Sequence, residues 1–369
     1  MTERTMRKKI PRYPGIAATM ILALLVLAVC AGAGCVSHQD TAVTPATAEP
    51  PSFSPETVPA SPATPPGTGQ AAGTTLQRII VTNADAAELL LAIGAGDRVV
   101  GVSDTVKNHP VLGPRYAGAA SIGSWQAPDI ETILSLHPDA VISYSSYTPK
   151  NTDRITSAGI PLLLIDCYKI DTLASDTRRL GNLTGRDAEA EEYVAFLEQY
   201  EALVRSQAAA HPPASPTRVY IESYSDYSAL TMGSGGDLLV TMAGGENIAG
   251  LLPVSSPKVN AEWVTAQDPD VIIKSAASGK NETELAEIHA KLVGRAGIAN
   301  TSAVRNGRVY VISGSVTYGP RSVIGLAWVA GILNPGTSAV IRPREIQDAY
   351  ASRFVAGTNT TATIYPQPG

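Results

Sequence analysis

Two glutamates recur in the same sequence setting, 131 positions apart. The segment at Glu131 reads E-T-I-L-S-L-H-P-D-A-V-I, and the segment at Glu262 reads E-W-V-T-A-Q-D-P-D-V-I-I. Both fit the pattern Glu-x-[Ile/Val]-x4-Pro-Asp-[Ala/Val]-[Val/Ile]-Ile. Two equivalent exposed carboxylates would suit a cationic partner with twofold symmetry. Alternatively, each carboxylate only complements the dipole of its own helix.

A second group of candidates consists of aromatic and polar residues that follow expected strands. Ligands of α/β sheets bind at the carboxyl ends of the strands, where these side chains would gather. Aromatic rings with polar tips suit a large, partly apolar ligand, although each tyrosine taken singly could be an ordinary half-buried residue. The candidates for ligand contact are Asn83, Trp125, Tyr144, Tyr147, Tyr224, Tyr227, Ser275 and Tyr318.

Arg321 is the sharpest single candidate for binding an anion. The sequence Gly319-Pro320-Arg321 indicates a helix start, because proline suits the first turn of a helix. A guanidinium near a helix N-terminus favours a bound carboxylate, phosphate or hydroxamate. The alternative is a structural ion pair.

The sequence contains no motif typical of an enzyme. It lacks a Ser/His/Asp nucleophile elbow, a phosphate-binding Gly-x4-Gly-Lys-Ser/Thr loop and a Cys-x-x-Cys pair. No cluster of His, Asp and Glu has metal-ligand spacing, so we expect no metal site and no intrinsic cofactor. Any metal should arrive already chelated. Among the histidines, only His109 could lie near a ligand, and we expect Cys167 to be a buried structural thiol.

The repeated pattern also predicts the elements that position the glutamates. Asp129 and Asn260 stand where N-caps are expected, and prolines end each short helix. The Val-Ile runs that follow lack polar alternation, which is typical of parallel strands covered on both faces. Between 187 and 210 an apolar stripe with helical spacing predicts one long helix, stopped by His-Pro-Pro.

These patterns predict an α/β fold with two Rossmann-like lobes joined by a single long helix. The expected boundaries are a signal peptide at 1–34, an anchor and Pro/Thr/Ala-rich tether at 35–75, an N-terminal lobe at 76–185, a bridging helix at 186–211, a C-terminal lobe at 214–356 and a tail at 357–369.

The N-terminus has the order of a secretory signal. Basic residues precede an apolar run and then the small-residue sequence A-G-A-G before Cys35. The apolar run is shorter than the ~20 residues of a comfortable membrane span. We therefore expect lipidation of Cys35, with plain secretion or a retained helix as alternatives. Removing residues 1–34 takes five basic residues and one acidic residue from a chain of net charge −5. The resulting charge of −9 gives no electrostatic reason to bind nucleic acid.

Over residues 76–355 the chain resembles the substrate-binding lipoproteins of ABC importers for iron chelates and corrinoids, whose lobes are joined by one rigid helix. The resemblance rests on I-V-T-N-A-D-A-A-E-L-L-L-A-I-G-A-G-D-R-V-V-G-V-S, on the two Glu…Pro-Asp copies and on the bridging helix. The segment S-G-S-V-T-Y-G-P-R-S-V-I-G-L-A-W-V-A-G-I-L-N-P resembles a C-terminal form often seen in archaeal members.

The resemblance implies a monomeric receptor on the outer face of the cytoplasmic membrane, held there by a lipid anchor. It would capture a ferric siderophore, a corrinoid or haem between its lobes and deliver the ligand to a permease dimer with its ATPase. Glu131 and Glu262 match the glutamates that dock onto the permease. A metallocluster or chelatase-type enzyme and a surface sensor without transport remain the alternatives from other classes.

Overall fold

Two mainly parallel sheets, one before and one after a long helix, organise the chain. The computed structural model describes residues 75–210, 215–337 and 340–368. The chain divides into two compact units, 1–64 and 65–369, and every described residue belongs to the second. The signal, Cys35 and nearly all of the tether expected from the sequence therefore lie outside the described residues.

The first sheet has the order β3-β2-β1-β6-β7, and all of its neighbouring strands pair in parallel. Its strands are β1 Ile79–Val81, β2 Val99–Val102, β3 Ala120–Ser121, β6 Ala140–Ser143 and β7 Leu162–Leu164. A small hairpin of β4 Gly123–Ser124 and β5 Ala127–Pro128 precedes the first repeat helix. The helices of this lobe are α1 Ala84–Ala92, α2 Asp104–Lys107, α3 Leu112–Arg115, α4 Ile130–Ser135, α5 Thr152–Ser157 and α6 Ile170–Thr184, with a 3-10 turn at Gly96–Arg98.

The second sheet has the order β12-β11-β10-β8-β9 and is parallel except for β12. Its strands are β8 Arg218–Glu222, β9 Glu246–Asn247, β10 Val271–Ala276, β11 Val309–Ser313 and β12 Ile364–Tyr365. The helices are α8 Gly235–Met242, α9 Ala261–Gln267, α10 Glu282–Val293, α11 Ser302–Arg305, α12 Gly314–Thr317, α13 Ser322–Leu333 and α14 Pro343–Arg353, with 3-10 turns at Pro335–Thr337 and Thr358–Thr360. Residues 357–369 were expected to form a tail, but β12 pairs with β11 and so belongs to this sheet.

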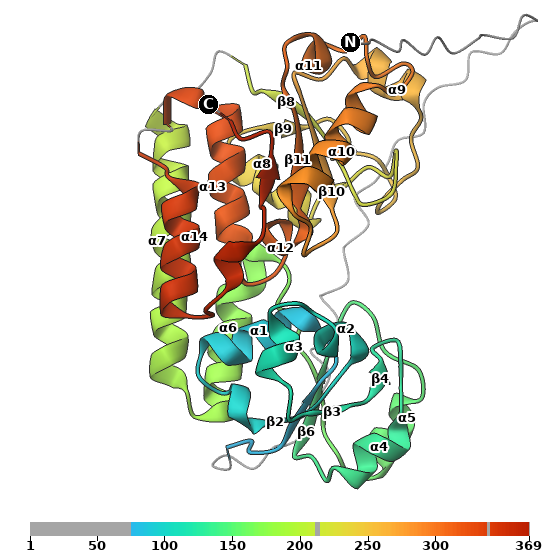
Figure 1. Ribbon diagram of the computed structural model, residues 1–369, viewed down its shortest axis with the longest axis vertical. Coiled ribbons are helices and arrows are strands. Elements are labelled where there is room, and N and C mark those ends of the chain that lie inside the picture. The colour runs from blue at the N-terminus through green and yellow to red at the C-terminus, as the bar shows by residue number, and fades with distance from the viewer. Residues whose placement is uncertain (1–74, 211–214, 338–339, 369) are drawn as a thin grey trace, which may run out of the picture. The chain divides into compact units, whose positions relative to one another are not determined.

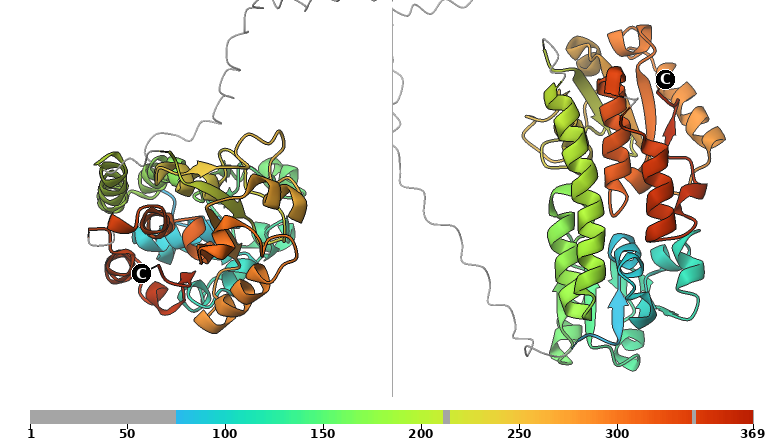
Figure 2. Two further views of the ribbon diagram at one scale, coloured as in Figure 1. Left: turned by 90° about the horizontal axis from the view of Figure 1, so that it is seen from above. Right: turned by 90° about the vertical axis from the view of Figure 1, so that its left-hand side faces the viewer.

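The long helix α7 runs over Asp187–Ala210, as the apolar stripe and the following prolines predict. It packs against α6 and α13, and α13 packs in turn against α14, so that these helices lie side by side (Figures 1 and 2). Tyr193 and Phe196 of the predicted stripe are fully buried against Tyr350 and Phe354. One hydrophobic cluster contains residues from both sheets and from α7. The predicted fold of two α/β lobes with a single bridging helix is confirmed.

The repeated sequence pattern builds the same junction in both lobes. Asp129 and Asn260 cap α4 and α9 through their side chains, as predicted, and the strands β6 and β10 that follow are fully buried. The backbone N–H of Arg78 donates to Asp139 at 2.8 Å, and that of Arg218 donates to Asp270 at 2.9 Å. The aspartate of each Pro-Asp pair thus fixes the start of the first strand of its lobe.

Each junction is closed a second time by an arginine side chain. The Arg78 guanidinium donates to the Leu136 carbonyl, and the Arg218 guanidinium donates to the Gln267 carbonyl. Both carbonyls lie at the end of a repeat helix, where backbone acceptors would otherwise lack partners.

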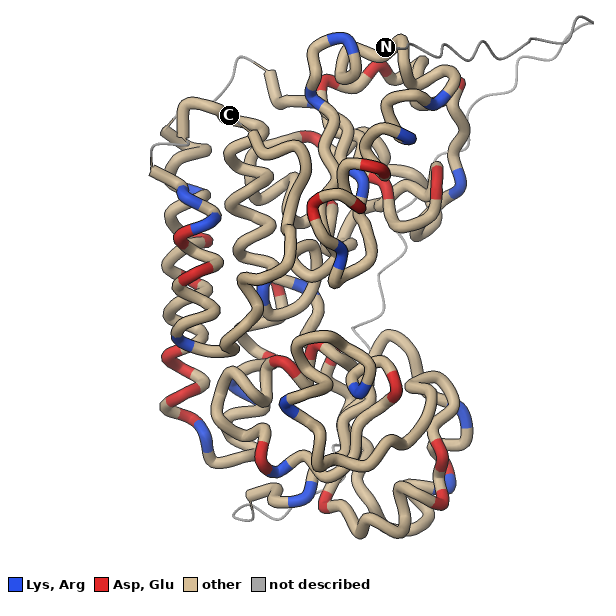
Figure 3. Tube along the Cα trace, viewed as in Figure 1, with Lys and Arg blue, Asp and Glu red and all other residues tan. Residues whose placement is uncertain are grey.

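Lys and Arg positions are interspersed with Asp and Glu over both lobes (Figure 3).

Candidate ligand-binding site

Aromatic side chains from both lobes form a continuous row in which each ring contacts the next. Neighbouring ring centroids lie 5.0 to 6.4 Å apart. We call this set the aromatic row; in order, its residues are Tyr147, Trp125, Tyr144, Tyr168, Tyr318 and Tyr224. The first four belong to the N-terminal lobe, and the last two belong to the C-terminal lobe.

The row forms because parallel strands bring their carboxyl ends to one edge of a sheet. Tyr144 directly follows β6, Tyr168 lies in the segment after β7, and Tyr224 lies two residues after β8. Tyr318 follows the short helix α12, which continues from β11. Most rings meet edge to face, an arrangement that adds to the stabilisation from burial alone. The row therefore presents a series of neighbouring aromatic rings, most of which carry a phenolic hydroxyl group.

The two lobes meet directly beside the row. The backbone N–H of Gly319 donates to the carbonyl of Tyr168 at 2.8 Å. Gly319 has φ +76°, and a Cβ at this position would lie 2.3 Å from a carboxyl oxygen of Asp85. Only glycine accommodates both the left-handed backbone and this close approach. The contact holds the middle of the row at the junction of the lobes.

Asp85 is the acid in this region whose pKa is shifted furthest from its ordinary value. It lies in the first turn of α1, is half-buried, and accepts a hydrogen bond from the Tyr144 hydroxyl at 3.3 Å. Burial, followed by the nearby Glu88 carboxylate, raises the pKa of Asp85 to about 7, against the opposing effects of Tyr144 and Arg321. Burial and the Asp85 charge likewise raise the pKa of Tyr144 well above its ordinary value. The site thus contains a carboxyl group that changes charge near neutral pH.

Asp166 behaves in the opposite way, because it is held by donors. Ser145 and Ser146 donate backbone N–H and hydroxyl hydrogen bonds to its carboxylate. Burial opposes ionisation of Asp166, but these hydrogen bonds outweigh it and lower the pKa. The carboxylate pins the loop between Tyr144 and Tyr147, so it fixes that end of the aromatic row.

Five of the residues predicted for ligand contact come together in the row: Trp125, Tyr144, Tyr147, Tyr224 and Tyr318. Ser275 lies beside the row, is fully buried, and lowers the pKa of Tyr318, which burial and Tyr168 raise to about 12. Tyr227 is not in the row; its ring packs under the Arg295 guanidinium at 5.0 Å.

Asn83 and Arg321 have structural roles in the interior. Asn83 is 1% exposed, caps α1 and donates to the Ile165 carbonyl, so its polar atoms are already engaged. Arg321 is 4% exposed, and its Nε lies 2.9 Å from a carboxylate oxygen of Glu88. The same carboxylate accepts the Tyr350 hydroxyl at 2.8 Å. The guanidinium thus faces a buried acid, the alternative that the sequence left open, and not an open ligand site.

Sequence reasoning missed Asp85 and Tyr168. Asp85 lies in the first turn of α1, where an acidic residue ordinarily complements the helix dipole, and no local pattern indicates that Gly319 packs against its carboxyl group. Tyr168 stands four residues beyond its strand, so a search for residues directly after strands passes over it. His109 accepts the backbone N–H groups of Val111 and Leu112, and burial, followed by the charge of Arg321, lowers its pKa. Cys167 is buried and burial raises its pKa well above the ordinary value, which is the state predicted for it.

The two predicted docking glutamates are both exposed in the first turns of equivalent helices. Glu131 is paired with Arg154 at 2.5 Å, and the Glu131 side chain is 74% exposed. Each carboxylate stands after an N-cap and before a buried strand, so the two lobes present their glutamates from the same local structure. Exposure is necessary for docking, and the geometry provides it at both positions.

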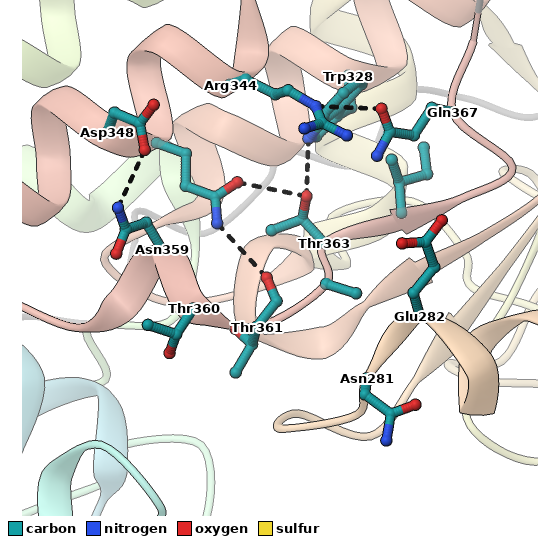
Figure 4. A pocket seen from close by; sticks show the side chains of 13 residues that line it. Asn281, Glu282, Trp328, Arg344, Asp348, Asn359, Thr360, Thr361, Thr363 and Gln367 are labelled. Carbon is teal, nitrogen blue, oxygen red and sulfur yellow. Dashed lines mark hydrogen bonds between the residues drawn. The ribbon is translucent and has the colours of Figure 1, made fainter.

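A separate cavity of about 300 Å³ lies at the C-terminal part of the chain (Figure 4). Its lining includes Gln347, Asn359, Thr361 and Gln367, and several of these side chains are hydrogen-bonded to one another or to neighbouring groups. We call it the C-terminal cavity. None of the aromatic row lines it.

Neither a bare metal site nor a membrane span is found in the described part of the chain. Residues 75–210, 215–337 and 340–368 contain no group of three or more His, Cys, Asp or Glu placed to hold a metal ion. Over the same ranges, every helix is too short or too polar to cross a bilayer.

Comparison with known proteins agrees with this architecture. The family model described as periplasmic binding protein matches residues 79–316, more than half of the chain. A vitamin B12-binding protein of Yersinia pestis (strain Pestoides F) is 28% identical over 208 residues, which are 55% of this chain and 71% of that protein.

Solved structures share the fold at lower identity. The periplasmic vitamin B12-binding protein of Vibrio cholerae is 24% identical with a TM-score of 0.59, covering 71% of this chain and 98% of that one. A periplasmic heme-binding protein of Pseudomonas aeruginosa is 24% identical with a TM-score of 0.58, covering 70% and 93%. A molybdate periplasmic binding protein of Haemophilus influenzae is 18% identical with a TM-score of 0.65, covering 79% and 95%. The chain belongs to the periplasmic binding protein family, in the class with two α/β lobes and one bridging helix.

Proposed function

We propose that this protein captures a metal chelate outside the cytoplasm and delivers it to an ABC-type permease with its ATPase. The observation that carries the proposal is the aromatic row, which crosses from one lobe to the other at the carboxyl ends of both sheets. A flat or macrocyclic chelate could lie along the rings while their hydroxyls bind its polar rim.

The metal would enter as part of its chelate. In the described residues no set of protein ligands could strip or hold a bare transition metal, whereas the row offers apolar area and hydroxyl donors. A ferric siderophore or related iron complex is our first candidate. A corrinoid or haem is the alternative within the same transport class, and the vitamin B12-binding and heme-binding relatives favour such large ligands.

Delivery requires a docking surface besides the ligand site. The exposed carboxylates of Glu131 and Glu262 are the best candidates, because they stand at equivalent places on the two lobes. A permease dimer would present matching cationic groups by its own symmetry. A lipid on Cys35 would hold the receptor at the membrane. No step of the proposal needs a catalytic residue, and we propose no enzymatic activity.

A thermal-shift screen of the purified protein tests the binding part. A ligand at 100 times its Kd adds about 2.7 kcal/mol to the free energy of unfolding. For a folded unit of this size we expect the melting temperature to rise by roughly 4–5 °C. The probes are a ferric hydroxamate, haemin and cyanocobalamin.

Tyr144→Ala should abolish the shift, since this ring contacts both Trp125 and Tyr168 in the row. Tyr200→Ala is the matched control, because Tyr200 is a half-buried tyrosine on α7 outside the row. A folded wild-type protein that responds to none of the probes would reduce the proposal to a similarity of fold.

A further inference from the structure

A cavity lined by basic side chains lies at the C-terminal-lobe end of the aromatic row. Its volume is about 290 Å³, and Tyr224 and Ser275 form part of its wall. Its cationic side chains come from β10, from the loop after it and from the region of α10: Lys274, Lys280, Lys291 and Arg295. We call it the basic cavity. It is separate from the C-terminal cavity of Figure 4, and no residue lines both.

A buried glutamate holds Lys274 and Arg295, which form the inner pair of cations. Glu222 is fully buried; it accepts Lys274 Nζ at 2.7 Å and both Arg295 Nη atoms at 2.9 to 3.0 Å. The Tyr227 ring packs against the same guanidinium. Lys274 and Arg295 are therefore held in one arrangement before any ligand arrives. Such preorganisation lowers the entropic cost of binding.

The outer cations are closer to solvent. Lys291 is exposed on α10, and Lys280 is half-buried and paired with Glu284 at 3.0 Å. The carboxylates that pair with these cations are Glu222, Asp226 and Glu284, so the four cations of the cavity retain one formal positive charge. Asp226 also lines the cavity, and its side chain is 65% exposed.

A buried hydroxyl in the cavity wall adds a polar contact point. Ser275 is fully buried, and its Oγ finds no hydrogen-bond partner of good geometry, although it lies close to the Tyr318 hydroxyl. A buried polar atom without a full partner is costly, and a ligand oxygen could supply that partner. Ser275 and Tyr224 line the same cavity as the cations.

We propose that the basic cavity binds an oxyanion group, a carboxylate or a similar anion, that belongs to the ligand of the aromatic row. The inference deepens the proposed function, on which it rests: the captured chelate is anionic and extends one arm past Tyr224. Lys280 and Lys291 contact the arm from outside, and Lys291 carries the charge that no carboxylate balances. Lys274 and Arg295, whose charges Glu222 and Asp226 balance, offer N–H donors beneath the arm. A free oxyanion such as molybdate carries the same chemistry, and the test separates the two sources.

The test compares haemin, haemin dimethyl ester and molybdate by isothermal titration of the full protein. Haemin carries two carboxylates and its dimethyl ester carries none on the same ring. The variant is Lys280→Gln/Lys291→Gln, which changes two side chains that are not buried and should leave the melting temperature of the free protein within about 2 °C. Arg205→Gln removes an exposed charge on α7 as the matched control.

We expect the double variant to weaken haemin binding by about tenfold, to spare the ester, and to make haemin binding less sensitive to salt. Haemin binding that is unchanged in the double variant would overturn the inference and leave the proposed function standing. Lysine-dependent binding of molybdate, with no binding of haemin or of the other chelates of the screen, would support the oxyanion site and refute the chelate function. Failure of every probe to bind would overturn both.

Discussion

Replacing Arg321 with methionine separates the two roles that the sequence allows for this side chain. In the structure the side chains of Arg321 and Glu88 are 5% and 6% exposed, and Nε lies 2.9 Å from Oε1. The substitution keeps most of the volume and removes the charge. It leaves the carboxylate of Glu88 buried with the Tyr350 hydroxyl as its remaining donor. An uncompensated buried charge is the main consequence.

The size of the effect follows from the burial. Breaking a buried ion pair by removing one partner costs about 3–5 kcal/mol, whereas an exposed pair is worth about 0–1 kcal/mol. For a folded unit of this size the loss corresponds to a fall in melting temperature of roughly 5–8 °C. The pair Arg342–Glu345, which is 59% and 67% exposed at 2.8 Å, provides the matched control. Arg342→Met should change the melting temperature by no more than a few degrees.

Urea denaturation of both variants measures the difference. The double variant Arg321→Met/Glu88→Met should recover much of the loss, because an apolar pair of similar volume often replaces a buried ion pair without cost. Recovery stays incomplete, since the buried Tyr350 hydroxyl loses its acceptor. If Arg321→Met instead unfolds like the wild type and loses only affinity for an anionic ligand, the assignment of Arg321 to the interior is wrong.

Two further predictions concern charge at the ligand site and at the docking surface. The pKa of Asp85 is raised to about 7, so its folded form holds a proton that the unfolded chain has lost above pH 4. The contribution of Asp85 to the free energy of unfolding is therefore complete below about pH 4. It is lost as the pH rises to 7, at up to about 1.4 kcal/mol per pH unit. Asp85→Asn should remove that slope in chemical denaturation. Separately, Glu131→Ala/Glu262→Ala should abolish uptake of the chelate while its binding to the purified protein is unchanged.

Each of these predictions has a result that would contradict it. If the free energy of unfolding varies with pH in the same way for the wild type and Asp85→Asn between pH 4 and 8, the pKa of the Asp85 carboxyl group is not raised as the structure implies. Normal uptake in the double glutamate variant would argue against docking through these residues. Retained chelate binding without any transport in the wild-type system would instead favour a surface sensor.

Local sequence signals predicted the framework well. The bounds of α7 follow from an apolar stripe and a terminating His-Pro-Pro, and both signals are independent of the rest of the chain. The N-caps Asp129 and Asn260 were predictable for the same reason. Buried parallel strands such as β10 follow from their uninterrupted apolar runs. These features are set by residues within a few positions of one another.

The candidate site was only partly predictable, because it depends on contacts distant in sequence. Arg321 and Glu88 are 233 residues apart, and no local pattern indicates that they meet. The pKa of Asp85 depends on packing against the second lobe through Gly319. Tyr144 and Tyr318 could be expected to follow strands, but the continuity of the row depends on Tyr168, which lies in the irregular segment between β7 and α6.

Locating the metal of a bound chelate by anomalous X-ray scattering tests the central claim most directly. With an iron or cobalt chelate bound, the account predicts one strong peak beside Tyr144, Tyr168 and Tyr318, between the two lobes. A peak in the C-terminal cavity, next to Asn359 and Gln367, would contradict the account.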